Sequence, residues 1–162
     1  MSLLKKQGGN VIILTIITAL LLTELPLPAV IAPYQPEWLI LVLIYWAMAL
    51  PERVGVGVAW FVGLLLDVLR DTLLGQYALA FALTVFITLR IYQRIRNFPL
   101  RQQVISIFIL MLIHTGLVVW IKALAGANVN FSMALIPALT SSLFWPFVYF
   151  VLRNIRRTYH VT

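Results

Sequence analysis

The stretch VISIFILMLIHTGLVVWIKALA, from Val104 to Ala125, carries one charged side chain, Lys122. An apolar stretch of about 20 residues is long enough for an α-helix to cross a bilayer. Five other apolar runs accompany this one, separated by short connections. We therefore predict an all-α, polytopic membrane protein with six transmembrane helices, forming a single integral membrane domain over residues 1–162. The predicted spans are 10–31, 36–50, 54–70, 76–92, 104–125 and 131–152.

The composition supports a protein that uses lipid as its solvent. Hydrophobic residues make up 62% of the chain and charged residues 10%, whereas a soluble domain carries about 25% charged residues. The net charge of +7 does not indicate nucleic-acid binding, because the basic residues are spread over several helix ends and no nucleic-acid motif is present. We expect membrane lipid to be the partner of these charges. The chain has no cysteine, which excludes disulfides and Cys-ligated zinc.

The positions of the basic residues predict the orientation in the membrane. Of the twelve Lys and Arg residues, all but Arg70 and Lys122 lie before the first run, at every second break or after the last run. Positive residues stay on the cytoplasmic side, so we predict that both termini are cytoplasmic. Aromatic residues collect at the bilayer interfaces, and we expect Trp46 at the inner one. The predicted inner basic residues are Lys5, Lys6, Arg53, Arg90, Arg94, Arg96, Arg101, Arg153, Arg156 and Arg157.

The first apolar run has an alternative reading as a secretory signal peptide. Lys5 and Lys6 followed by an apolar stretch are typical of such a peptide. A cleavage site should follow the stretch, yet the one small-residue candidate, residues 30–32, is followed directly by Pro33. We therefore favour a first helix that is retained in the protein.

The second and third runs are short for full crossings, and they could instead form a re-entrant hairpin. The hairpin would leave four full crossings and the same final orientation. We favour two crossings because the third helix can continue through Arg70 and Asp71 toward Gly75, a residue type that commonly ends helices.

Small residues recur every four positions on two predicted helices, which places them on one face where another backbone can approach closely. We expect these stripes to pack within the chain, with packing against a partner protein as the alternative. Pro137 and Pro146 predict a kinked sixth helix that is buried in the bundle. The stripes are Gly55, Ala59 and Gly63 on the third helix, and Ala134, Ala138 and Ser142 on the sixth.

Ionisable side chains inside a membrane are costly, so each one needs a partner or a role. We interpret Glu24 as interfacial, because the first helix leaves the bilayer there. Asp67 lies one turn before Arg70 and Asp71, so it can pair with Arg70 while Asp71 crowds the same patch. This turn is either a local ion pair or a site for a partner or ligand. We expect His114 to be a neutral hydrogen-bonding residue.

The sequence gives little support for catalysis. Serines are present, but no Gly-x-Ser-x-Gly motif surrounds any of them. His114 and His160 are the only histidines, and no His-Glu-x-x-His motif exists to bind a catalytic metal. We therefore expect a protein that is not an enzyme, with no metal site and no cofactor.

Short motifs in a fixed order connect the chain to a known family. They are Pro36-Glu37-Trp38, Leu50-Pro51, Gly63-Leu64-Leu65-Leu66-Asp67, Leu74-Gly75-Gln76-Tyr77-Ala78-Leu79, Leu143-Phe144-Trp145-Pro146 and Leu152-Arg153-Asn154-Ile155-Arg156-Arg157. Their order and spacing resemble the MreD family of rod shape-determining proteins over essentially the whole chain. Arg70 and Asp71 depart from this pattern, because many members carry small or uncharged residues there. The resemblance marks Gly63, Asp67, Gly75, Trp145, Pro146 and Arg153 as family-motif residues.

The resemblance implies a non-enzymatic subunit of the bacterial inner membrane that belongs to the cell-elongation (Rod) complex. Such proteins bind MreC, and through it connect the MreB cytoskeleton with RodA and a class B penicillin-binding protein for peptidoglycan synthesis. The family is also similar in fold to the S component of energy-coupling-factor vitamin transporters. That similarity implies an alternative function as a small-molecule-binding or transport subunit.

Overall fold

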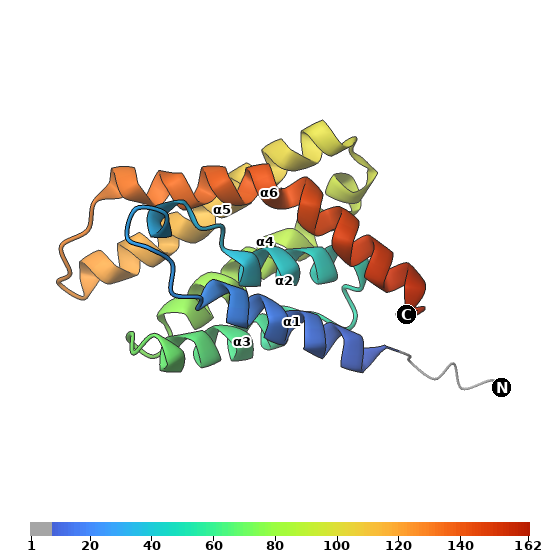
Figure 1. Cartoon of the computed structure of the whole chain (residues 1–162), viewed down its shortest axis with the longest axis horizontal. Coiled ribbons are helices and arrows are strands. Elements are labelled where there is room, and N and C mark those ends of the chain that lie inside the picture. The colour runs from blue at the N-terminus through green and yellow to red at the C-terminus, as the bar shows by residue number, and fades with distance from the viewer. Residues whose placement is uncertain (1–7) are drawn as a thin grey trace.

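The computed structural model describes residues 8–162, except for the side chain of Met133, and the predicted all-α class is confirmed for this part of the chain (Figure 1). Six α-helices and one short 3-10 helix follow one another without a strand within the described residues. They are α1 (Gly9–Thr23), η1 (Ala32–Tyr34), α2 (Trp38–Ala49), α3 (Val56–Leu69), α4 (Gln76–Asn97), α5 (Leu100–Leu124) and α6 (Phe131–Thr158).

The helices near the N-terminus are shorter than the apolar runs that predict them. α1 ends at Thr23 rather than near residue 31, because Pro26 and Pro28 cannot continue a helix. The predicted continuation of the third helix toward Gly75 is wrong. α3 ends at Leu69, and Asp71 then takes the left-handed conformation with φ of 53°, which breaks the helix.

The later helices are longer than predicted. α4 extends to Asn97, α5 begins at Leu100 and α6 continues to Thr158, so the basic residues that follow the apolar runs are themselves helical. Lys and Arg near a helix C-terminus interact favourably with the helix dipole. By length and composition, α4, α5 and residues Ala134–Thr158 of α6 are long and apolar enough to cross a membrane, while α1 and α3 are apolar but shorter.

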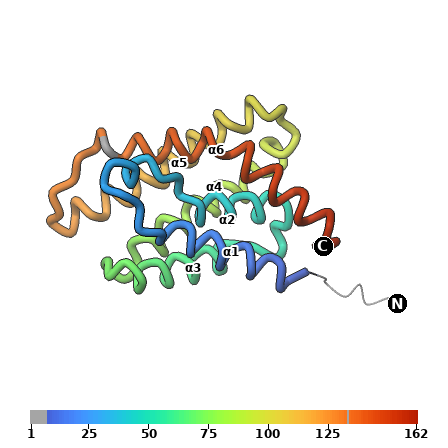
Figure 2. The backbone as a smooth tube through the Cα atoms, viewed as in Figure 1, coloured from blue at the N-terminus to red at the C-terminus, as the bar shows by residue number. Residues whose placement is uncertain are grey.

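α2 is the centre of the bundle. It has 12 residues and thus a length of about 18 Å, well below the ~30 Å hydrocarbon thickness. Every residue from Leu39 to Ala49 is buried, and α1, α4 and α6 pack around it (Figures 1 and 2). Trp46 near the end of α2 packs against other helices: its ring is fully buried and its Nε1–H donates to Thr15 Oγ1 at 2.9 Å, while its expected position at the inner interface stays a prediction.

The predicted small-residue stripes pack within the chain at most of their positions. Gly63 lies directly against the backbone of Ala78 in α4, and Ala59 is fully buried. Gly55 is the exception, because nothing lies within 4 Å of the place where its side chain would be. On α6, Ala138 and Ser142 are buried and Ala134 is half-buried. α6 contains Pro137 and Pro146 and bends along its length in Figure 1, as a proline-containing helix is expected to do.

The two ends of the bundle differ in their chemistry. At one end, Gly8 lies against Val161, and Arg53 from the α2–α3 connection donates to the carbonyl of Thr162. Figure 2 shows the start of α1 and the C-terminus at this same end. We call it the basic end, because the arginines at the C-terminal ends of α4 and α6 also lie there. The other end, which carries Glu37, is called the Glu37 end.

Candidate functional site

Asp67 caps the N-terminus of α4 from its place on α3. The carboxylate is fully buried and accepts hydrogen bonds from the backbone N–H of Gly75 (3.0 Å), Tyr77 (2.9 Å) and Ala78 (3.3 Å). It also accepts from the Thr72 hydroxyl at 2.9 Å. The first N–H groups of a helix have no partner inside it and carry partial positive charge, so a carboxylate stabilises them. Asp67 therefore closes the α3–α4 hairpin.

Arg70 pairs with Glu24 and not with Asp67, so the predicted ion pair is wrong. Its Nε lies 2.7 Å from Glu24 Oε1, and its NH1 donates to the Tyr77 hydroxyl at 2.8 Å. The guanidinium carbon lies 5.1 Å from the centre of the Tyr77 ring. Asp71 is exposed and has a left-handed backbone conformation. Arg70 thus joins the end of α1 to the α3–α4 hairpin.

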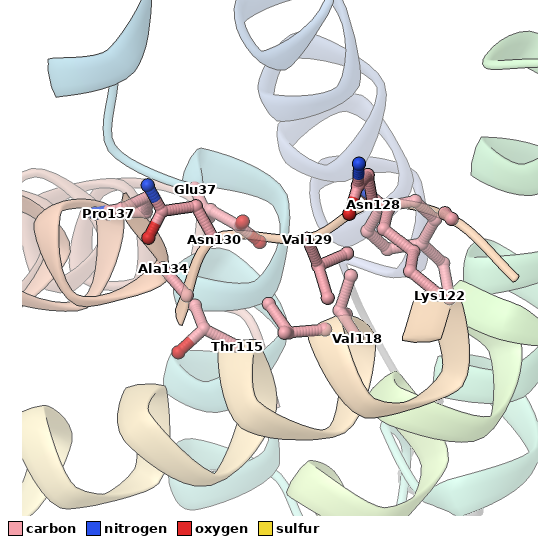
Figure 3. A pocket seen from close by; sticks show the side chains of 12 residues that line it. Glu37, Thr115, Val118, Lys122, Asn128, Val129, Asn130, Ala134 and Pro137 are labelled. Carbon is pink, nitrogen blue, oxygen red and sulfur yellow. The ribbon is translucent and has the colours of Figure 1, made fainter. Parts of the chain in front are cut away.

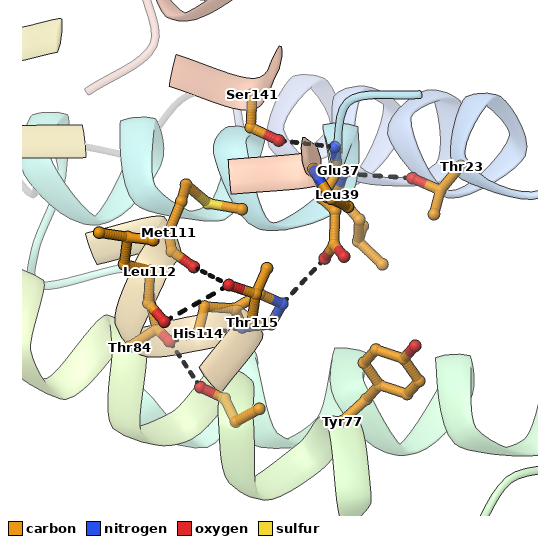
Figure 4. A network of polar contacts seen from close by, with 12 residues as sticks. Thr23, Glu37, Leu39, Tyr77, Thr84, Met111, Leu112, His114, Thr115 and Ser141 are labelled. Carbon is orange, nitrogen blue, oxygen red and sulfur yellow. Dashed lines mark hydrogen bonds and ion pairs between the residues drawn. The ribbon is translucent and has the colours of Figure 1, made fainter. Parts of the chain in front are cut away.

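Glu37 was not predicted as a site residue, although it lies in one of the motifs. It immediately precedes α2, and its Oε2 lies 2.9 Å from His114 Nε2 (Figure 4). Its backbone N–H donates to Ser141 Oγ at 3.0 Å. His114 is fully buried, whereas the Glu37 side chain keeps 23% exposure. Glu37 therefore links a buried imidazole to an accessible surface.

His114 is the centre of a polar network between helices. Its Nδ1 lies 3.5 Å from Thr84 Oγ1 on α4, while Glu37 holds its Nε2. The prediction of a hydrogen-bonding histidine agrees with this geometry. The second ionisable group beside it could not be identified from the sequence, because Glu37 lies 77 positions away along the chain.

Two neighbouring cavities at the Glu37 end share Glu37 and Pro137. The larger, of about 340 Å³, brings Glu37 and Lys122 to opposite sides (Figure 3). Its polar lining also includes Tyr77, Thr115, Asn128 and Asn130. The smaller, of about 260 Å³, is lined by Thr23, Gln35 and Arg70 besides Glu37. A carboxylate, an ammonium and two amides suit a polar ligand that carries both charges. Within residues 8–162, no group of His, Asp and Glu could hold a metal ion.

A lateral groove lies between α1 and α6, with α2 as its floor. Its volume is about 410 Å³. Thr15 and Thr18 contribute hydroxyls, but these already donate to the carbonyls of Ile12 (2.7 Å) and Leu14 (2.8 Å) in their own helix. The groove therefore presents an apolar surface. The remaining lining residues are Ala19, Leu22, Trp38, Val42, Phe147, Val148, Val151, Leu152 and Ile155.

Comparison with known proteins identifies the family of this α-helical bundle. Residues 5–155 match the family model described as the rod shape-determining protein MreD. The chain belongs to the MreD family. A MreD protein of Haemophilus influenzae is 30% identical over 141 residues, which cover 87% of this chain and 87% of the relative. No solved structure matches the chain. The chain is thus a multi-pass membrane protein of a non-enzymatic, shape-determining family.

Four of the residues predicted as family motifs, Gly63, Asp67, Gly75 and Trp145, make contacts between helices. Gly63, Asp67 and Gly75 all belong to the α3–α4 hairpin, and Gly75 has a positive φ of 101° that suits glycine. Trp145 is fully buried, and its Nε1–H donates to Gln103 Oε1 at 3.3 Å between α6 and α5. Pro146 lies inside α6. Arg153 is near the basic end, with its guanidinium carbon 5.9 Å from the centre of the Tyr149 ring.

Proposed function

We propose that this MreD-family protein is a scaffold of the cell-elongation (Rod) complex in the bacterial inner membrane, and that it binds the transmembrane helix of MreC in the lateral groove. The observation that supports this most is the apolar groove itself, which runs between two helices of the bundle and is floored by a third. Because almost all of the chain is helix and short connections, its means of acting on other proteins is contact through these helices.

The chemistry of the groove favours a helix as its occupant. Its threonine hydroxyls are already bonded, so it offers shape and apolar contact rather than polar recognition. Within a membrane, helices associate by close packing, since lipid tails are as apolar as the side chains. A partner helix that lies parallel to α1 and α6 can insert its side chains along the whole groove. A lipid chain is the competing occupant.

The same proposal includes six crossings with both termini in the cytoplasm. The basic end holds the start of α1, the α2–α3 connection and the C-terminal residues together. A re-entrant hairpin would place the α2–α3 connection in the middle of the bundle, so its position at the basic end favours passes from one end of the bundle to the other, even for the short α2. Positive residues favour the cytoplasmic side, which assigns the basic end to the cytoplasm and the Glu37 end to the periplasm.

As a scaffold, the protein would act on MreC by binding one of its conformations more tightly than another. A coupling of about 1–3 kcal/mol between states is typical of such effects. MreC would in turn connect this bias to MreB, RodA and a class B penicillin-binding protein. In this mechanism the chain makes and breaks no covalent bond.

Cysteine crosslinking tests the groove as the MreC site, and the absence of native cysteine makes single-cysteine variants clean reporters. We expect Val151→Cys to crosslink to a cysteine in the transmembrane helix of MreC. Ile109→Cys on α5 is the matched control, because Ile109 is more exposed than Val151 (53% against 39%) but does not line the groove. Equal crosslinking at both positions, or crosslinking at Ile109 alone, would contradict the proposed site. Labelling of both cysteines by a lipid-soluble reagent confirms that each is accessible.

A second candidate function is a small-molecule-binding or transport subunit similar to a vitamin-transporter S component. The observation that favours it is the cavity at the Glu37 end, where Glu37 and Lys122 face a space of about 340 Å³. Ligand pockets of proteins are commonly about 300–1,000 Å³ and have a few placed polar groups.

Native mass spectrometry of the purified protein separates the two functions. If the scaffold proposal is correct, we expect no stoichiometric metabolite to remain bound. A bound small molecule that is lost in Glu37→Gln would instead establish the second function. Glu24→Gln is the control, because Glu24 does not line either cavity at that end.

A further inference from the structure

Three arginines from two helices converge on a small hollow at the basic end. Arg96 comes from the last turn of α4, and Arg153 and Arg156 come from α6. The hollow has a volume of about 90 Å³, and Tyr45 of the buried helix α2 is part of its lining. No carboxylate is among the residues that line it in the described part of the chain. A strongly positive concave site therefore lies between α4 and α6.

The ion pairs Glu24–Arg70 and Glu37–His114 do not balance the charge of this hollow. Both lie at the Glu37 end and include none of the three arginines. Glu52 lies in the α2–α3 connection and does not line the hollow. Three like charges in one place repel each other, so an anion that binds all three would remove an unfavourable interaction.

The helix dipole explains only part of the cluster. Arg96 and Arg156 lie in the last turns of their helices, where a positive charge is favourable. Arg153 lies before the last turn of α6, yet it lines the same hollow. Aromatic rings also position the guanidinium groups: Arg153 is 5.9 Å from the centre of the Tyr149 ring and Arg96 is 5.9 Å from that of Tyr92. The arginines are thus arranged before any ligand arrives.

We propose that this hollow binds the phosphate headgroup of an anionic phospholipid. Arginine is the residue best suited to phosphate, because its planar donors form paired charge-assisted hydrogen bonds. The small volume suits a compact anion. Basic pockets between membrane helices on the cytoplasmic side are typical sites for acidic lipid headgroups. The inference rests on the hollow and on the proposed cytoplasmic orientation of the basic end, but not on MreC binding.

A lipid, rather than free phosphate, fits the surroundings of the hollow. Phe150, whose ring packs against that of Tyr149 in the lining of the hollow, is large, apolar and exposed. A phospholipid whose phosphate is held by the arginines could place its acyl chains along this apolar surface. Binding would also join α4 to α6, which meet the same headgroup from two sides.

The test titrates the full-length protein with phosphatidylglycerol and, separately, with phosphatidylcholine. Native mass spectrometry measures how much of each lipid is bound. The hollow variant combines Arg96→Gln, Arg153→Gln and Arg156→Gln. The matched control combines Arg90→Gln, Arg94→Gln and Arg101→Gln, which removes the same charge from exposed arginines that do not line the hollow. We expect the hollow variant to lose at least about tenfold in phosphatidylglycerol affinity relative to the control variant.

Three outcomes would overturn the proposal. Equal losses in the two variants would show diffuse electrostatic attraction without a site. Equal affinity for phosphatidylglycerol and phosphatidylcholine in the unchanged protein would show no preference for an anionic headgroup. If inorganic phosphate displaces phosphatidylglycerol when the lipid is at a concentration that saturates the site, the hollow would be assigned to free phosphate. If the triple variant does not fold by circular dichroism, Arg153→Gln alone against Arg94→Gln provides the same comparison.

Discussion

Replacing Gly63 with alanine is expected to destabilise the protein by about 1–3 kcal/mol, and replacing it with leucine by more. A Cβ at this position would lie 2.5 Å from the Cα of Ala78 and 2.7 Å from both the Ala78 nitrogen and the Tyr77 carbonyl oxygen. All three atoms belong to the backbone of α4, so no side chain can rotate away. The added methyl group must therefore separate α3 from α4, which also stretches the hydrogen bonds that Asp67 makes.

Gly57→Ala is the control on the same helix. Nothing lies within 4 Å of the place where its Cβ would be, so alanine there is expected to gain about 0.5–1 kcal/mol from helix propensity alone. Thermal unfolding of both variants in the same detergent measures the difference, and the two substitutions should move the melting temperature in opposite directions. A Gly63→Ala protein as stable as the unchanged protein would show that the α3–α4 contact is loose.

Changing Asp67 to asparagine is expected to cost at least about 3 kcal/mol of folding stability. Hydrogen bonds to a charged group contribute about 1.5–3 kcal/mol each, and Asp67 accepts four from the α3–α4 hairpin. Asparagine has nearly the same size, but its NH₂ group would face backbone N–H donors instead of accepting from them. Tyr77 N–H donates to one carboxylate oxygen, and the N–H groups of Gly75 and Ala78 donate to the other. Asparagine keeps only one of these acceptors, so amide hydrogen exchange should become faster either at Tyr77 or at Gly75 and Ala78.

Glu24→Gln is the comparison for Asp67→Asn. The Glu24–Arg70 pair is partly exposed, and such pairs contribute about 0–1 kcal/mol. Asp71→Asn is a second control, because the exposed Asp71 has a positive φ that asparagine tolerates. Cell shape gives a separate readout. Should Asp67→Asn fold normally and yet fail to support rod shape, Asp67 would have a role beyond capping α4.

The long helices could be predicted from the sequence because their length and apolar character together specify a crossing. α4, α5 and α6 lie where apolar runs predict them. Their ends differ from the predicted ends because the flanking segments with basic residues are also helical. The position of α2 could not be predicted in this way. A run such as 38–49 has the same composition whether lipid or other helices surround it, and only the packing of α1, α4 and α6 decides between them.

The polar contacts were harder to predict because they join distant parts of the chain. The rule that residues three and four apart share a helix face predicts an Asp67–Arg70 pair, but α3 ends at Leu69. Asp67 remains on the helix while Arg70 turns toward Glu24. The partners of Asp67 are three backbone amides and the Thr72 hydroxyl, and no periodic pattern in the sequence indicates them. The Glu37–His114 contact likewise has no periodic pattern that could reveal it.

The burial of α2 sets an order for the protein's biogenesis. Synthesis proceeds from the N-terminus, so α2 is made before α4 and α6, the helices that cover it. Glu37, at its start, meets His114 and Ser141 only after α5 and the first part of α6 have left the ribosome. Until then α2 lies beside the translocon or in lipid, without the helices that cover it in the finished bundle. A chain that stalls before α6 would therefore expose the segment on which the finished bundle is built, and would be a ready substrate for membrane proteases.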